Sequence, residues 1–397
     1  MATTSRLEFR DPARARGLVS ALEQTMAAIG RPVTVMHVCG SHEQAIARFG
    51  LRASLPPNLN LVMGPGCPVC ITDMPEIDEA YALAMQGVRI ATYGDMVRVP
   101  GSAGSLADAQ AAGGTVDVVY SVAQAVDLAR STGEEVCFFA TGFETTAVAT
   151  AAVVLANPPA NFSVLSAHKY IPPAMEIVAG MPDSKVEGFI AAGHAATITG
   201  SALFEPFAER HHVPVVVAGF EPLDILAALV RLTELIRDGQ PRVENMFPRC
   251  VTREGNRNAL AQLWRVFEVR GGRWRGIAEI PDGNLRLRAE WAHLDARCRF
   301  TIDASALWAR TPSALVQQCI CGSIMAGNAS PDDCPLFGHE CLPETPVGAC
   351  MVSSEGTCRI WHQYAGVPDL RQCPTCVSVV DPSGPSFKGA GGNHERA

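Results

Sequence analysis

Short apolar runs rich in β-branched residues alternate with helical patterns over the first 240 positions. Continuous or alternating apolar runs favour strands, and apolar residues at three- and four-residue spacing favour helices. The sequence therefore predicts a helix over 11–30 and strands at 33–38, 59–63, 88–93, 116–121, 162–165 and 186–191. Strands that alternate with helices at this spacing predict parallel βαβ units.

The character of the chain changes near residue 240, where arginine, tryptophan and glycine become more frequent and the strand–helix rhythm weakens. We therefore expect an α/β fold with two parallel-sheet βαβ domains, over 1–130 and 131–240, and a smaller loop-rich part over 241–397. The tail from Pro382 is rich in glycine and polar residues, and we expect it to be disordered.

Three cysteines directly follow the first two predicted strands. Cys39 follows 33–38, and Cys67 and Cys70 follow 59–63. Because the loops at the carboxyl ends of parallel strands form the ligand crevice of an α/β sheet, we expect these thiols to share one crevice. Thiolate is both a nucleophile and a soft metal ligand, which favours metal or redox chemistry. The alternative is that they are ordinary buried cysteines of an apolar core.

The residues after Cys39 predict the start of a helix. Ser41 with Gln44 three residues later is a capping-box pattern. Cys39 should then lie beside a helix N-terminus, where backbone N–H groups and the helix dipole favour the thiolate form.

Six further cysteines crowd into positions 319–358, among glycine and proline residues that indicate loops. Such a segment needs something other than a hydrophobic core to hold it, and a metal centre would do so. The long, uneven gaps differ from the paired short knuckles of a zinc ribbon. They suit four thiolates around a [4Fe–4S] cluster, with zinc as the open alternative.

Composition and charge narrow the class of protein. The 397 residues are 48% hydrophobic and 18% charged with a formal net charge of −8, which indicates a folded chain and argues against a nucleic-acid partner. The N-terminal segment lacks the apolar region of a secretory signal, and no apolar run reaches the length of a membrane span. We therefore expect a cytoplasmic protein, in which 14 cysteines favour metal ligands or redox thiols over a disulfide framework.

A strand, a Gly-Phe-Glu turn and a helix occur twice, with Glu144 and Glu221 at the two helix starts. A site role and simple complementarity to the helix dipole explain these glutamates equally well. His168 and His194 also follow apolar strands, and for each alone a structural histidine is the favoured interpretation.

Several motifs together resemble the HypD family of hydrogenase maturation proteins. They are CGSHE at 39–43, GPGCPVC at 64–70, TYGDMVRVPGS at 92–102, ATGFETT at 140–146, HKYIPPAM at 168–175, AGFEP at 218–222 and the cysteine series at 319–358. The resemblance runs in order from residue 33 to residue 364, and the cysteine series is its most specific part.

The resemblance implies a scaffold for assembly of the iron fragment of [NiFe]-hydrogenase, an iron that carries two cyanides and one carbon monoxide. The implied partners are a small chaperone of the HypC type and HypE, through which the cyanide arrives. The implied cofactor is a [4Fe–4S] cluster, with the Fe(CN)2CO iron bound transiently. The implied fold of two α/β domains and a smaller iron–sulfur part agrees with the change near residue 240.

The resemblance also implies roles for particular residues. Cys39 would hold the iron jointly with the N-terminal cysteine of HypC, and His42 would be a ligand or a neighbouring partner. Cys67 and Cys70 correspond to a thioredoxin-like redox pair, which agrees with the ability of Cys-x-x-Cys to close into a disulfide.

For the cluster, six thiols compete for four positions. We predict as its ligands Cys321, Cys334, Cys341 and Cys358. Cys319 and Cys350 remain alternates, and Glu355 is expected either near the assembly site or in a turn role. Cys373 and Cys376 lie in an extension that we do not associate with the family, and a redox pair, a weak metal site and an incidental pair all stay open.

Two other functions stay open from the residues alone. A stand-alone thiol–disulfide or electron-transfer protein would use Cys67 and Cys70 with an iron–sulfur cluster, and it would not need Cys39. A zinc-stabilised interaction module would use the late cysteines and would carry zinc without iron or labile sulfide.

Overall fold

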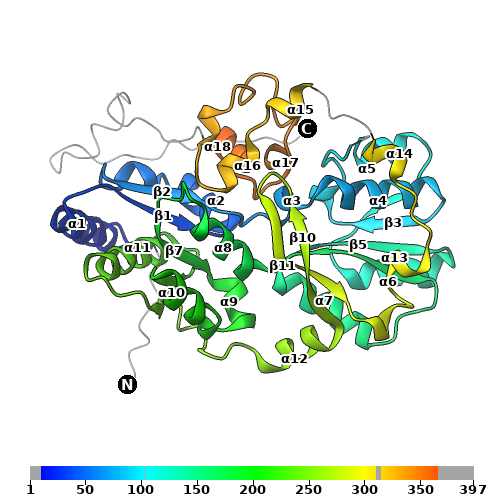
Figure 1. The fold of residues 1–397 in the computed structure, drawn as a ribbon, viewed down its shortest axis with the longest axis horizontal. Coiled ribbons are helices and arrows are strands. Elements are labelled where there is room, and N and C mark those ends of the chain that lie inside the picture. The colour runs from blue at the N-terminus through cyan, green and yellow to red at the C-terminus, as the bar shows by residue number, and fades with distance from the viewer. Residues whose placement is uncertain (1–9, 103, 310–313, 365–397) are drawn as a thin grey trace, which may run out of the picture.

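The computed structural model describes residues 10–102, 104–309 and 314–364. Its parallel strands form two sheets that lie side by side along the long axis of the molecule, with helices on their faces (Figure 1). The expected α/β class with parallel βαβ units is confirmed. None of the helices in these ranges combines the length and apolar character that crossing a membrane requires.

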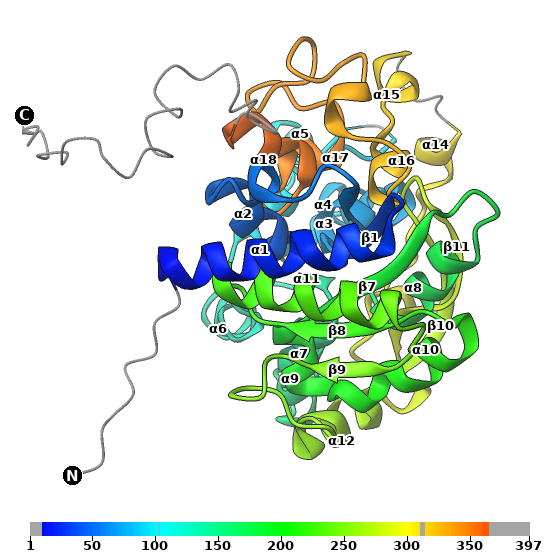
Figure 2. The same ribbon diagram turned by 90° about the vertical axis from the view of Figure 1, so that its left-hand side faces the viewer.

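The larger sheet has five parallel strands, in the spatial order β2 (Leu59–Met63), β1 (Val33–His37), β7 (Val186–Ala192), β8 (Val215–Ala218) and β9 (Val243–Asn245). Its central strands are buried on both sides, because one group of helices covers each face. One face carries α1 (Pro12–Ile29), α2 (Gly40–Arg48) and α11 (Pro222–Arg237). The other carries α8 (Ile171–Gly180), α9 (Gly193–Thr199) and α10 (Glu205–His211). Figure 2 shows α1 and α11 lying alongside each other over the strands.

The smaller sheet has four parallel strands, in the order β4 (Val116–Val118), β3 (Arg89–Thr92), β5 (Val136–Gly142) and β6 (Phe162–His168). One face packs against α6 (Val122–Thr132), α7 (Glu144–Leu155) and α12 (Arg257–Val266). The other packs against α4 (Met74–Met85) and α5 (Leu106–Ala111) and against part of the C-terminal region. This second face is therefore where the cysteine-rich segment joins the α/β body.

The two sheets do not follow the expected division at residue 130. β1 pairs with β2 and with β7, which begins at residue 186. The whole smaller sheet is built by the chain between β2 and β7. The chain therefore leaves the larger sheet after β2 and returns at β7, which pairs directly with β1. Hydrophobic pattern marks a strand but not its neighbour, and consecutive strands are adjacent only about two-thirds of the time.

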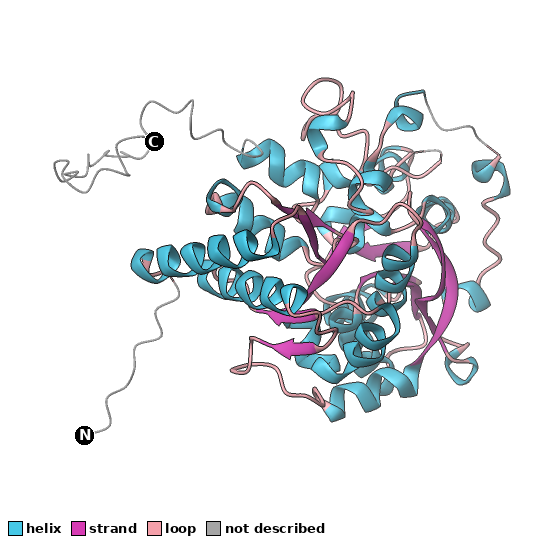
Figure 3. Cartoon of the chain, turned by 60° about the vertical axis from the view of Figure 1, so that its left-hand side comes forward, coloured by secondary structure: helices cyan, strands magenta, loops and turns pink. Residues whose placement is uncertain are grey.

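After residue 266 an antiparallel hairpin replaces the βα rhythm. Its strands β10 (Phe267–Trp274) and β11 (Ala278–Leu287) pack against β6 and α8. Short helices follow: α13 (Ala296–Arg299), α14 (Ser305–Trp308), α15 (Ala314–Gln318), α16 (Cys321–Met325), α17 (Ala349–Val352) and α18 (Thr357–Tyr364). Figure 3 shows short helices and pink loops at the top of the molecule, where Figure 1 places α16, α17 and α18. One further short helix, α3 (Pro68–Ile71), follows β2 and packs against α17. The 3-10 turns are η1 (Leu51–Ser54), η2 (Gly94–Met96), η3 (Ser201–Phe204), η4 (Ala289–Trp291) and η5 (Pro331–Asp333).

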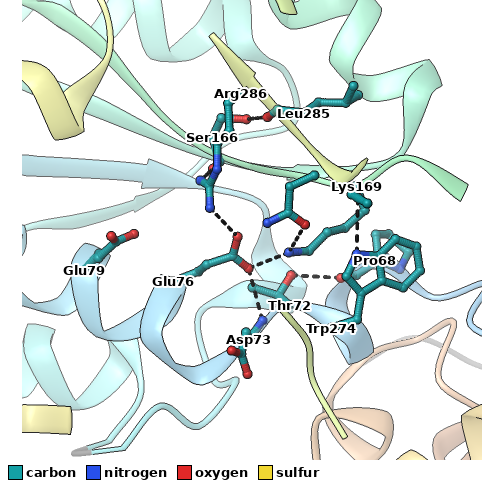
Figure 4. Close-up of polar contacts among 12 residues, drawn as sticks. Pro68, Thr72, Asp73, Glu76, Glu79, Ser166, Lys169, Trp274, Leu285 and Arg286 are labelled. Carbon is teal, nitrogen blue, oxygen red and sulfur yellow. Dashed lines mark hydrogen bonds and ion pairs between the residues drawn. The ribbon is translucent and has the colours of Figure 1, made fainter. Parts of the chain in front are cut away.

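A buried ion pair holds the segment that follows α3 (Figure 4). The Lys169 Nζ, fully buried after β6, donates to Glu76 Oε2 at 2.8 Å and to Asn284 Oδ1 at 3.0 Å. Burial lowers the pKa of Lys169. Burial alone would raise the pKa of Glu76, but the positive charges of Lys169 and Arg286 outweigh this effect and hold the pKa of Glu76 below its usual value. Because Glu76 also accepts from the Asp73 N–H at 3.1 Å, the pair fixes the start of α4.

A second buried carboxylate, Glu43 in α2, ties the C-terminal helix to the larger sheet. It accepts both guanidinium N–H groups of Arg52 at 2.8 and 2.7 Å, the His37 Nε2–H at 2.8 Å and the Trp361 Nε1–H at 2.7 Å. Burial would raise the pKa of Glu43, but Arg52 and His37 outweigh it and hold the pKa far below its usual value. An ionised carboxylate with four donors in the core therefore joins β1, α2 and α18.

We expect Glu43→Gln to lower the free energy of unfolding by about 3–5 kcal/mol, because it leaves the buried guanidinium of Arg52 without its anion and removes the charged acceptor of His37 and Trp361. Urea denaturation followed by circular dichroism would measure this. The control is Glu134→Gln, which removes an exposed carboxylate that pairs with Arg89 and should change stability by less than about 1 kcal/mol. Equal stabilities of the two variants would contradict the role of Glu43.

Candidate metal and redox site

Cys39 lies at the carboxyl end of β1 as the N-cap residue of α2, so the predicted helix start beside Cys39 is confirmed. The predicted capping box is not formed, because Ser41 lies inside α2 and is not its N-cap. The residue is 2% exposed, and its Sγ lies 3.9 Å from His194 Nδ1. Burial raises the pKa of the thiol to about 12, and it outweighs the backbone N–H groups of Ser41 and His42, which lower it. The helix N-terminus lowers the pKa of the Cys39 thiol, as expected, but burial raises it further, so the isolated thiol is neutral at neutral pH. A cation at Cys39 would reverse that balance.

His194 lies beside Cys39, although for this residue alone the sequence favoured a structural role. It follows β7, and β7 pairs with β1 in a register that sets Ile190 opposite His37. This pairing brings the turn after β7 next to the turn that carries Cys39. Burial lowers the pKa of His194, so the ring is neutral and one nitrogen keeps a lone pair. Its position directly after a strand was a signal, but only the strand order showed which strand was adjacent.

His42 lies in the first turn of α2, where the sequence placed it, and is 1% exposed. Its Nε2–H donates to the Gly219 carbonyl at 3.0 Å, and its ring packs on Phe220 with centroids 4.9 Å apart. Burial lowers its pKa to about 3, which keeps the ring neutral. Its Nδ1 is shielded from solvent and has no hydrogen-bond partner among the described residues, so a lone pair stays available there.

Cys67 and Cys70 are joined by a disulfide at the start of α3, and both are fully buried. The loop before them touches the Cys39 turn through its backbone. A Cβ added at Gly66 would lie 2.2 Å from the Cys39 nitrogen and 2.5 Å from its Cα, and the Gly66 carbonyl accepts from the Gly40 N–H at 3.2 Å. Only glycine permits this approach, which sets the loop that carries the disulfide directly against the Cys39 turn.

The C-terminal cysteines gather beside the disulfide. Cys319 Sγ lies 3.3 Å from Cys321 Sγ. The thiol of Cys350 adjoins those of Cys321 and Cys358, which raise its pKa. Of the residues predicted as ligands, Cys321 thus adjoins both alternates, Cys319 and Cys350, and Cys358 adjoins Cys350. The other two predicted ligands, Cys334 and Cys341, lie in the same buried core, which also contains Cys67 and Cys70.

The chemistry of this cysteine group, defined as Cys319, Cys321, Cys350 and Cys358, fits a metal–thiolate centre. Four thiols are the donor set of a [4Fe–4S] cluster and also of structural zinc. A Cβ at Gly348 would lie 2.7 Å from the Sγ atoms of both Cys319 and Cys321, so the glycine leaves space beside the thiols.

Glu355 connects the C-terminal segment to the Cys39 turn. Its Oε1 accepts from the Ser41 Oγ–H at 3.2 Å, and the charge of its carboxylate raises the pKa of Cys39. Burial in turn raises the pKa of Glu355 itself. It lies near the candidate site, as expected. Cys373 and Cys376 lie outside the described residues.

The two Gly-Phe-Glu turns have different roles. Glu221 pairs with Arg10 at 2.9 Å near the surface and caps α11, which its helix position explains. Glu144 is fully buried. Together with Gly66 and His194 it lines a small cavity of about 10 Å³. Its Oε1 accepts from the Ile171 N–H at 2.8 Å, its Oε2 has no partner among the described residues, and burial raises its pKa to about 7.

We expect Gly66→Ala to lower the free energy of unfolding by at least about 1–3 kcal/mol, since the methyl group meets backbone atoms that cannot rotate away. Thermal and urea denaturation would measure it. Gly17→Ala is the control, because that position in α1 has nothing within 4 Å of an added Cβ. If Gly66→Ala matches wild type, the close backbone contact is wrong.

Glu144 makes stability depend on pH. Its pKa is about 7 in the folded protein against an ordinary value of 4.5, so the native state binds the extra proton between these pH values and loses stability as the pH rises through them. At about 1.4 kcal/mol per pH unit the effect reaches about 3 kcal/mol. Glu144→Gln should therefore gain stability relative to wild type between pH 5 and pH 8. A constant difference in urea denaturation at both values would contradict this.

Comparison with known proteins gives a consistent result. The family model for HypD, described as the hydrogenase formation hypA family, matches residues 13–365. The hydrogenase maturation factor HypD of Azotobacter vinelandii is 42% identical over 386 residues, covering 94% of this chain and 98% of the relative. HypD of Rhizobium leguminosarum bv. viciae is 42% identical over 371 residues, covering 90% and 94%, and HypD of Cupriavidus necator is 39% identical over 376 residues, covering 91% and 97%.

The match spans both sheets, the hairpin and the cysteine-rich segment, and thus includes every part that builds the Cys39 turn and the cysteine group. The resemblance seen in the motifs is confirmed over nearly the whole chain. The chain belongs to the HypD family of hydrogenase maturation factors.

Proposed function

We propose that this maturation factor is the scaffold on which the Fe(CN)2CO fragment of [NiFe]-hydrogenase is assembled, with the iron held at Cys39. The observation that carries the proposal is the pair of Cys39 and His194, 3.9 Å apart at the buried meeting point of β1 and β7. A thiolate and an imidazole nitrogen are both good donors to iron, and the pair leaves the remaining positions of the metal to other ligands.

Protonation at Cys39 would make binding of the iron reversible. The buried thiol is neutral, so the incoming iron has to displace its proton, and the metal charge then compensates for burial of the thiolate. His194 and His42 stay neutral, so their rings add no positive charge to repel the iron. His42 keeps its fixed orientation through its bond to the Gly219 carbonyl.

The Cys67–Cys70 disulfide would serve as the redox partner of the site. Its reduction takes two electrons and yields two thiols beside the Cys39 turn. A [4Fe–4S] cluster on four of the six late cysteines would, when bound, supply single electrons. Cys321 and Cys358 belong both to the predicted ligands and to the cysteine group, and the contacts support them best.

We further propose that the chain acts in the cytoplasm in a complex with a small chaperone of the HypC type and receives cyanide through HypE. Free buried thiols in this number are compatible with a reducing compartment. The chaperone would supply a further cysteine to the iron at Cys39. The relatives named above are maturation factors, which agrees with action on a hydrogenase precursor.

We expect infrared spectra of the anaerobically purified protein, co-expressed with its HypC-type partner, to contain cyanide and carbonyl stretches of iron. Cys39→Ala should abolish the bands, and His194→Ala should weaken or shift them. Cys298→Ala, which removes an exposed free thiol, is the matched control and should leave them unchanged.

Bands that survive Cys39→Ala would overturn the choice of iron ligand. Absence of the bands from the wild-type complex, with iron and labile sulfide present, would favour the alternative of a thiol–disulfide or electron-transfer protein. Stoichiometric zinc without iron or sulfide would favour a zinc-stabilised interaction module.

A further inference from the structure

Arg275 lies at the tip of the β10–β11 hairpin, between the disulfide helix and the cysteine group. Its backbone N–H donates to the carbonyl of Ile71, the last residue of α3, at 3.0 Å. On the other side the hairpin tip touches the start of α16, where a Cβ on Gly322 would lie 1.9 Å from the Gly276 carbonyl oxygen. The tip is therefore wedged between the helix that carries Cys70 and the backbone next to Cys321.

The Arg275 side chain lies beside one carboxylate and two thiols. It lines a pocket of about 420 Å³ together with Asp73, Cys319 and Cys321. Burial lowers the pKa of Arg275, and the neighbouring Cys321, Asp73 and Cys319 partly offset that effect. The guanidinium thus faces the cysteine group from the side of the disulfide.

One nitrogen of this guanidinium, Nη1, is shielded from solvent and has no hydrogen-bond partner among the described residues. A guanidinium cannot shed its proton, and a buried charged N–H without an acceptor is costly. Neutral thiols are weak acceptors. Thiolate and sulfide bound to a metal carry negative charge and accept N–H bonds well, and such bonds help to set the potential of iron–sulfur centres.

We propose that Arg275 donates its Nη1–H to a metal-bound sulfur of the cysteine group and is the positioning residue that stabilises the reduced form of that centre. This inference rests on the metal–thiolate centre proposed above and is independent of the iron at Cys39. The positive charge of Arg275 offsets the negative charge that the centre gains on reduction, so its reduction potential is higher with the arginine than without it.

The test compares Arg275→Gln with Arg273→Gln in the full chain, purified anaerobically. Arg273 lines the same pocket but is exposed, so its substitution removes the same charge without removing the shielded donor. Iron and sulfide content is measured first, and the reduction potential then follows from redox titration monitored by electron paramagnetic resonance. Arg275→Gln should lower the ratio of reduced to oxidised centre at a fixed solution potential about tenfold, which is 59 mV for one electron. Arg273→Gln should give a clearly smaller change.

Arg275→Lys keeps the charge but not the planar fork, and it should give a potential between those of wild type and Arg275→Gln. If Arg275→Gln fails to fold, the lysine variant carries the same test. An unchanged potential, or equal shifts in Arg275→Gln and Arg273→Gln, would overturn the proposal.

The metal content of the wild type decides the remaining cases. If the cysteine group holds zinc, Arg275→Gln should lose about tenfold in zinc affinity in competition with a chelator, and equal affinities would reject the role. Wild-type protein without metal on the cysteine group would also reject it. The infrared bands of the Cys39 complex are a separate measurement, so they test the scaffold function independently of the role of Arg275.

Discussion

A single buried carboxylate holds the functional parts of this protein in one body. Glu43 stays ionised in the core because Arg52, His37 and Trp361 all donate to it. A charge in this position is tolerated because these donors compensate for its burial, and loss of Arg52 would leave the carboxylate without its guanidinium partner. The Cys39 turn, which begins α2, and the C-terminal helix α18, whose second residue is Cys358, are therefore held in one arrangement.

Close contacts between backbone segments also hold these parts together. Gly66 brings the disulfide loop against Cys39, and Gly276 with Gly322 brings the hairpin tip against the cysteine group. These contacts exclude water, and exclusion of water is what keeps the Cys39 thiol protonated and the ring of His42 neutral. The same burial that disfavours an isolated thiolate makes the site receptive to a cation, because the cation removes the electrostatic cost.

The sequence patterns placed the candidate cysteines correctly in the local structure. A helix start beside Cys39 was predicted, although Ser41 is not its cap, and Cys39 and Cys67 were predicted to follow strands, which the structure shows to be paired. Local rules succeed here because a cap or a strand end depends on residues within a few positions. The spacing of the late cysteines indicated that they would gather, but their spacing does not reveal which thiols touch.

The class of fold, the cysteines at strand ends and the family could all be predicted from the sequence, since these depend on local pattern and on motifs. The return of the chain at β7 to pair with β1 could not be predicted, and this pairing sets His194 beside Cys39. The tertiary structure also separated Glu144, which is buried at the cavity, from Glu221, which is paired near the surface. The reason is that such contacts join residues more than 100 positions apart, and their geometry depends on strand order and burial, which no local pattern encodes.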